Sequence, residues 1–137
     1  MSDYTNYKHS DLTSTIIKMA YYVYDYLGYG FLETVYEKAL AKKLREAGFK
    51  VERQKQIKVY FEEELVGDFK ADIIANNCVI IELKAIEKIH PKHEVQLVNY
   101  LKSTEIEVGL LINFGEKLEV KRKVFSNDRK RKMNRIP

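Results

Sequence analysis

One carboxylate and one ammonium interrupt a β-branched apolar run within residues 76–85. Glu82 and Lys84 lie two residues apart in this β-branched run, so on a strand their side chains leave the same face. A buried charge is unfavourable unless it is paired or bound to a metal. The stretch therefore predicts either a structural ion pair or a site that does chemistry.

A second carboxylate, Asp72, lies upstream in another strand-like run, residues 67–74. An Asp followed by Glu-x-Lys on the next strand could hold a divalent cation and an attacking water at a sheet edge. Carboxylate oxygens suit Mg²⁺ or Mn²⁺, and a lysine beside the cation could orient the water or neutralise charge developing on a phosphate. On spacing alone, a surface ion pair between Glu82 and Lys84 is an equally good interpretation.

The connection between the two strands decides whether Asp72 and Glu82 can share a cation. A two-residue loop, Asn76 and Asn77, would place the two carboxylates on opposite faces of the hairpin, whereas a three-residue loop ending at Cys78 pairs Asp72 with Glu82. Asparagine tolerates the positive φ that such loops need. We therefore predict a three-residue connection or a compensating bulge, with the two carboxylates within about 6 Å.

The length of 137 residues predicts one domain with a core of its own, which we place at residues 1–127. The single cysteine, Cys78, is interpreted as core filling within the apolar strand; it excludes a disulfide framework and fits a reducing, cytoplasmic location. No apolar run is as long as a membrane span, and the N-terminus lacks a signal-peptide pattern, so no membrane association is expected.

Positive charge is concentrated at the C-terminal end. Residues 118–137 carry eight Lys/Arg and two Asp/Glu, whereas the other 117 residues carry 16 and 18. The run Arg129, Lys130, Arg131 and Lys132 lies in what we predict to be a basic tail, residues 128–137. Such a run is most often a solvated end, and a nucleic-acid-binding arm is the alternative.

Hydrophobic periodicity predicts helices and strands in the order α-α-β-β-β-α-β-β, with Ser10 or Asp11 as candidate N-caps of the first helix. Paired glycines end that helix, Gly48 ends the second, and Pro91 opens the third. An α/β fold follows, in which helices flank a mixed sheet. The expected helices are 11–27, about 32–47 and 91–101, and the expected strands are 49–61, 65–75, 78–85, 108–114 and 118–125.

Five ordered motifs together resemble the PD-(D/E)XK nuclease superfamily, and specifically its small GxxExxY family. GFLETVY at 30–36 matches the naming motif, and QLVNY at 96–100 resembles the QxxxY element of RecB-like nucleases. IELK at 81–84 and Asp72 match the strands of the metal site, with Ala71 where the superfamily's name has proline. GLLINFG at 109–115 matches the strand that follows. The resemblance implies a restriction-endonuclease-like fold.

The resemblance also implies roles for individual residues. Asp72, Glu82 and the Leu83 carbonyl would bind the metal, with Glu33 as an accessory ligand. Lys84 would orient the water or stabilise the transition state, while Gln96 and Tyr100 would line the site from the third helix. Tyr36 would pack the helix of Glu33 against the sheet, and His93 is a weaker candidate for the site.

These observations favour a Mg²⁺- or Mn²⁺-dependent nuclease whose substrate is nucleic acid, with DNA preferred. A non-catalytic nucleic-acid-binding or assembly module of the same fold is the alternative, and a metal-binding regulatory subunit is a third class. The D…E-x-K set favours the enzyme, because a binding module has no need of buried, mutually repelling carboxylates. A homodimer is left open, since a chain this small often needs two copies to cut both strands.

Overall fold

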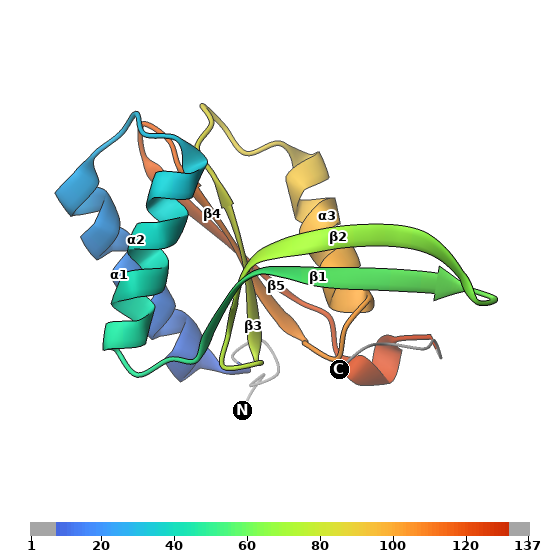
Figure 1. Cartoon of the computed structure of the whole chain (residues 1–137). Helices are drawn as coiled ribbons and strands as arrows, with labels where there is room; N and C mark the ends of the chain where they lie inside the picture. The colour runs from blue at the N-terminus through green and yellow to red at the C-terminus, as the bar shows by residue number, and fades with distance from the viewer. Residues whose placement is uncertain (1–7, 132–137) are drawn as a thin grey trace.

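The computed structural model describes residues 8–131 and places one five-stranded sheet between two helical layers (Figure 1). The predicted fold class and the predicted order of helices and strands are confirmed. The elements are α1 (Ser10–Leu27), α2 (Glu33–Glu46), β1 (Val51–Phe61), β2 (Glu64–Ala75), β3 (Val79–Lys84), α3 (Pro91–Lys102), β4 (Val108–Phe114), β5 (Leu118–Val124) and a short 3₁₀ helix, η2 (Asn127–Arg129).

The sheet is mixed, with spatial order β1-β2-β3-β4-β5, and only β3 and β4 run parallel. A parallel pair needs a crossover connection, and α3 supplies it. Helices α1 and α2 cover one face of the sheet and α3 covers the other (Figure 1). Each face therefore has its own apolar core, and β3 is buried between them as the apolar run predicts.

Two local predictions differ from the structure. The N-cap of α1 is His9, with φ 56° and no side-chain capping bond, so the choice of Ser10 or Asp11 is wrong; both residues already lie in the first turn. Cys78 lies in the turn before β3 rather than in the strand, although it packs against the core as expected. Among the described residues, no helix is long and apolar enough to cross a membrane.

The β2–β3 hairpin has the predicted three-residue connection. Ala75 pairs with Val79, and both Asn76 and Asn77 adopt φ 53°. The Asn76 side chain accepts a hydrogen bond from the Lys50 N–H over 2.8 Å, which ties the turn to the start of the sheet. Asparagine tolerates this left-handed conformation better than most residues. The resulting register places Asp72 level with Glu82.

The sheet forks at this level. Main-chain pairing between β2 and β3 ends at Ile73 and Ile81, whereas pairing between β1 and β2 continues to Phe61 and Glu64. Strands β1 and β2 therefore leave the sheet as a two-stranded arm that extends beyond the rest of the molecule (Figure 1). The expectation of a site at a sheet edge is thus corrected: the candidate residues lie beside the central strand, where the arm diverges from it.

Candidate active site

Asp72 and Glu82 are joined by hydrogen bonds across the fork. The N–H of Asp72 donates to Glu82 Oε1 over 3.0 Å, and the N–H of Leu83 donates to Asp72 Oδ2 over 2.8 Å. Carboxylate oxygens thus take the places that main-chain carbonyls would occupy in a continued ladder. The two strands themselves fix both carboxyl groups, so little side-chain freedom remains to be lost when a ligand binds.

The position of these carboxyl groups is electrostatically unfavourable. Glu82 is 6% exposed, and burial raises its pKa to about 8, with a further contribution from the neighbouring Asp72 carboxylate. Burial also raises the pKa of Asp72, although the hydrogen bond from Leu83 N–H opposes the rise. Two buried carboxylates repel each other, and a bound cation would stabilise the ionised form of both.

Lys84 follows Glu82 on the same face of β3, at the end of the strand. No carboxylate of the described residues lies within 4 Å of its ammonium group. Glu82 and Lys84 therefore do not form the ion pair that was the alternative interpretation of their spacing. Buried Asn113 fixes the chain just after Lys84: its side chain accepts from Ile86 N–H and donates to Ile86 O, both over 3.0 Å.

Helix α2 brings Glu33 to the site. Glu33 is the first residue of α2 and is half-buried. Burial raises its pKa, the Asp72 carboxylate adds to the rise, and the Lys84 ammonium opposes it. Glu33 thus lies close enough to both groups to interact with them electrostatically. Tyr36 packs as predicted, with its ring stacked 4.4 Å from that of Phe114 on β4.

Helix α3 approaches the site from the other face of the sheet. Gln96 Nε2 donates to the Tyr100 hydroxyl over 3.0 Å. Burial raises the pKa of Tyr100 to about 12, and the charges of Glu82 and Asp72 contribute, so the phenol stays protonated beside the carboxylates. The close approach of α3 to β4 requires Gly109, because a Cβ there would lie 2.7 Å from Leu97 Cδ1.

His93 is chiefly a helix cap. Its Nδ1 accepts a hydrogen bond from His90 N–H, while His90 Nδ1 accepts one from Lys92 N–H, forming a capping box at the start of α3. Burial and then the charge of Lys84 lower the pKa of His93, which places its ring near the site as a neutral imidazole. The site therefore gathers Asp72, Glu82, Lys84, Glu33, Gln96, Tyr100 and His93.

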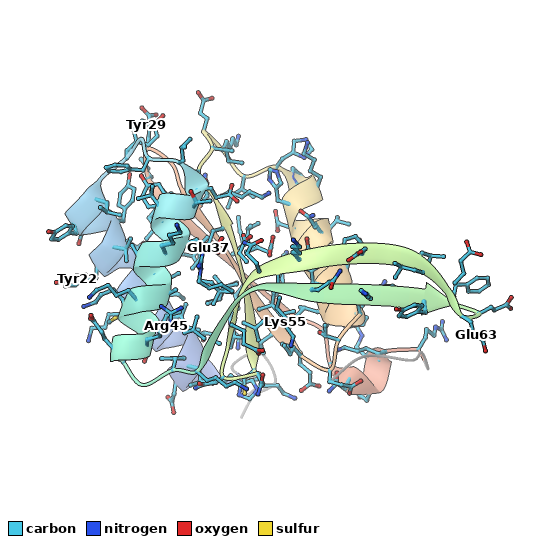
Figure 2. All side chains as sticks on the ribbon, viewed as in Figure 1. Tyr22, Tyr29, Glu37, Arg45, Lys55 and Glu63 are labelled. Carbon is cyan, nitrogen blue, oxygen red and sulfur yellow. The ribbon has the colours of Figure 1, made fainter. Side chains whose placement is uncertain are left out.

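Three residues behind the carboxylates were missed by the sequence interpretation. Glu37 is 2% exposed and forms an ion pair with Arg53 at 3.0 Å. Gln54 Nε2 donates to Glu37 Oε1 over 2.9 Å and to Asp72 Oδ1 over 3.3 Å. Figure 2 shows Glu37 on the side of α2 that faces the fork of the sheet. Its spacing of one helical turn from Glu33 could have predicted a shared face.

Gln54 has an unusual backbone. Its φ is 53°, and the β1–β2 register passes from Arg53–Ile73 to Lys55–Ala71, leaving Gln54 and Asp72 unpaired opposite each other. A non-glycine residue in this conformation is strained by about 1–2 kcal/mol. The irregularity turns the Gln54 amide toward Asp72, and the pattern of β1 in the sequence gives no indication of it.

The donor set fits a hard divalent cation. Asp72 and Glu82 supply carboxylate oxygens, and no residue among 8–131 donates a hydrogen bond to Glu82 Oε2. The described residues hold no group of three or more His, Cys, Asp or Glu side chains arranged for a metal. Two carboxylates suit Mg²⁺, which takes one or two and keeps several waters, better than a cation that needs an all-protein cage.

The basic segment lies apart from these residues. Arg129, Lys130 and Arg131 line a groove at the far end of α3, and Lys132 lies outside the described residues. Lys130 Nζ donates to the carbonyls of Thr104 and Ile106 over 2.8 and 2.9 Å. As far as Arg131, the last described residue, this segment is therefore part of the surface of the domain.

Comparison with known families agrees with this geometry. A sequence model of the PD-(D/E)XK nuclease superfamily matches residues 10–123. This range includes every residue of the site, helices α1 to α3 and, except for Val124 at the end of β5, all five strands. No curated protein and no solved structure shows a significant match to the chain. The mixed sheet with flanking helices is consistent with a restriction-endonuclease-like fold. The chain belongs to the PD-(D/E)XK nuclease superfamily.

Proposed function

We propose that this protein is a Mg²⁺- or Mn²⁺-dependent nuclease that hydrolyses phosphodiester bonds in DNA, of the GxxExxY type within its superfamily. The observation that carries the proposal is the buried Asp72–Glu82 pair, locked by hydrogen bonds in the fork of the sheet, with Lys84 unpaired among the described residues beside it. Burying two carboxylates side by side disfavours folding, so a structural role does not account for the pair. Binding of a cationic ligand does account for it.

Asp72, Glu82 and the Leu83 carbonyl are the proposed metal ligands, with Glu33 joining directly or through a water. When bound, a divalent cation neutralises the phosphate oxygens and lowers the pKa of a coordinated water. The raised pKa values of Asp72 and Glu82 support this assignment, since both groups gain from a neighbouring positive charge.

The other residues act on the water and on the phosphate. The Lys84 ammonium, with three donors and no ion-pair partner within 4 Å among the described residues, is placed to orient the water or to neutralise charge on phosphorus. The Tyr100 hydroxyl accepts from Gln96 and stays protonated, so its own hydrogen can be donated to a phosphate oxygen or to a water.

Substrate affinity would come from outside the carboxylate pair. The proposed phosphate-contacting residues are Arg129, Lys130, Arg131 and Lys132, because a polyanion gains affinity from every neutralised phosphate. Cleavage of both strands of a duplex would call for a homodimer or for two successive events.

A cleavage panel tests the proposal. Single-stranded, duplex and branched DNA and RNA are incubated with the protein in Mg²⁺, Mn²⁺ or EDTA. We expect DNA cleavage in either metal and none in EDTA. Glu82→Gln and Lys84→Ala should each lower the rate by about 10²-fold or more. Lys117→Ala, an exposed lysine in the β4–β5 turn, is the matched control and should cleave normally.

Two outcomes would contradict the proposal. Cleavage that survives Glu82→Gln would show that a contaminant or another site is responsible. Failure to cleave any substrate, in a protein that Mn²⁺ nevertheless stabilises, would favour the non-catalytic module of the same fold.

A further inference from the structure

A groove of about 600 Å³ lies at the end of α3 away from the candidate active site. Its walls come from three separate parts of the chain: the outer part of the β1–β2 arm, the last turn of α3, and the segment after β5. Four of the described lining residues are cationic and none is acidic. The lining residues that carry the inference are Phe69, Asn99, Lys102, Phe125, Arg129 and Arg131.

Hydrogen bonds attach the C-terminal wall of this groove to the rest of the domain. Phe125 N–H donates to Glu107 O over 2.8 Å, and Asn127 Nδ2 donates to Glu105 O over 3.0 Å. Lys130 donates to two carbonyls in the segment that leads into β4. The positions of Arg129 and Arg131 are therefore set by the fold, so their charges form a defined surface and not merely a basic composition.

Cations and aromatic rings alternate along the groove. The Arg129 guanidinium lies 4.6 Å from the centre of the Phe125 ring, and Lys102 Nζ lies 5.5 Å from it. Phe125 and Phe69 are both half-buried, so part of each ring remains accessible. Positive charge attracts phosphates, and an accessible ring offers a surface on which any base can stack. Together they fit a polyanion with exposed flat apolar groups.

A contact between two aromatic rings connects the groove to the candidate active site. The ring of Phe69 lies 5.4 Å from the ring of Tyr100. Tyr100 faces the carboxylates, whereas Asn99 and Lys102, its neighbours on α3, face the groove. One helix thus carries residues of both sites. A strand whose phosphate is held near Glu82 and Lys84 would have its flanking nucleotides led along α3 toward Phe125.

We propose that this groove binds an unpaired stretch of the substrate strand next to the scissile phosphate, so that the enzyme acts on single-stranded or locally opened nucleic acid. The inference rests on the proposed nuclease function. Bases in a duplex are stacked on each other and paired, and only phosphates would reach the groove. In a single strand the bases are free to stack on Phe69 and Phe125 while the phosphates meet Lys102, Arg129 and Arg131.

Binding in EDTA tests the groove without any cleavage. Fluorescence anisotropy would be measured with the full chain and labelled 12-nucleotide single strands of DNA and RNA and a 12-base-pair DNA duplex, from 50 to 200 mM salt. We expect the single strands to bind more tightly than the duplex. The double variant Lys102→Ala/Arg129→Ala should bind the single strands more weakly, with the salt slope reduced by about 0.7 for each phosphate that is no longer neutralised.

Stacking requires its own variant. Phe125→Leu keeps an apolar side chain but removes the ring, and should weaken single-strand binding about tenfold with little change in the salt slope. Lys117→Ala is again the control, a surface lysine away from the groove. If Phe125→Leu lowers the melting temperature, the double variant, whose two side chains are exposed, still decides the question.

The outcomes separate this inference from the nuclease proposal. Unchanged single-strand affinity in the double variant, or equal effects of every variant on duplex and single strand, would overturn the groove assignment even in an active nuclease. Conversely, groove variants that lose single-strand binding in a protein that never cleaves would support the groove and reject the nuclease.

Discussion

Replacing Gln54 separates backbone strain from the positioning of Asp72. The Gln54 amide donates hydrogen bonds to both Glu37 and Asp72. The backbone of Gln54 has φ 53°, a conformation that glycine adopts without strain and other residues do not. We compare Gln54→Gly with Gln54→Ala. Both substitutions remove the amide, but only glycine relieves the strained backbone. The two variants should therefore differ in stability but have the same metal affinity and cleavage rate.

The expected stabilities follow from three contributions. Removing the amide loses two hydrogen bonds to carboxylates, one of them long, which we take as about 1–2 kcal/mol in either variant. Alanine retains a backbone strain of about 1–2 kcal/mol, which glycine removes. Glycine loses about 0.5–1 kcal/mol through the entropy of the unfolded chain. Gln54→Gly should therefore be equal to or up to about 1.5 kcal/mol more stable than Gln54→Ala, whereas glycine is normally the less stable choice in a strand.

Function should fall equally in both variants. Groups that hold a metal ligand in place usually contribute about 10- to 100-fold to metal affinity. We expect the Mn²⁺ dissociation constant, measured by calorimetry on the purified protein, to rise by about tenfold in each variant, together with a lower cleavage rate. Gln56→Ala is the matched control: Gln56 lies two residues away on β1 and donates to Asp68 over 2.9 Å, but it pairs regularly with Lys70.

Two results would refute this reasoning. If Gln54→Ala is clearly more stable than Gln54→Gly in urea unfolding, the left-handed backbone is not a source of strain. If both variants bind Mn²⁺ as the parent protein and the Gln56→Ala control do, Gln54 supports the arm but does not position Asp72.

Four further outcomes are expected. In EDTA, the free energy of unfolding should fall by up to a few kcal/mol as pH rises from about 4.5 to 8, because the raised pKa of Glu82 makes the folded state hold a proton that the unfolded state releases. Glu82→Gln should reduce this slope in urea titrations at each pH, and an unchanged slope would contradict the assignment to Glu82. Mn²⁺ at a hundred times its dissociation constant should stabilise the protein by about 2.7 kcal/mol, and an unchanged melting temperature would contradict a metal site. Tyr36→Phe should destabilise by about 1 kcal/mol, since it loses the 2.6 Å bond to Gly28 O but keeps its ring, and unaltered urea unfolding would argue against this role. Gly109→Ala should destabilise by about 1–3 kcal/mol through the clash with Leu97, and a variant of normal stability would show that α3 can shift.

The parts of the structure that the sequence predicts well are those set by local pattern. The apolar runs and the glycine and proline positions indicate the order of helices and strands, because burial of one face determines each of them. The hairpin register was predictable for a sharper reason: only a three-residue connection places Asp72 and Glu82 on one face, and two asparagines supply the necessary conformations.

The residues that the sequence interpretation missed depend on tertiary contacts. Glu37 resembles a surface charge on an amphipathic helix until Arg53 is brought against it. Gln54 has no intrinsic preference for positive φ, and nothing in the pattern of β1 marks it. Asn113 stands in a strand that is otherwise apolar, and a polar residue in a fully buried strand is the kind of exception that indicates a specific hydrogen-bonding role.

The fork of the sheet is the physical link between these missed residues and the chemistry. In a regular sheet, the N–H groups of Asp72 and Leu83 would donate to main-chain carbonyls of the neighbouring strands. The two carboxylates could not then accept hydrogen bonds from them. Because main-chain pairing between β2 and β3 ends at Ile73 and Ile81, the N–H groups of Asp72 and Leu83 are satisfied by the two carboxylates instead. The irregularity of β1 lies at the same level, where Gln54 is opposite Asp72 and its amide donates a further hydrogen bond to the Asp72 carboxylate.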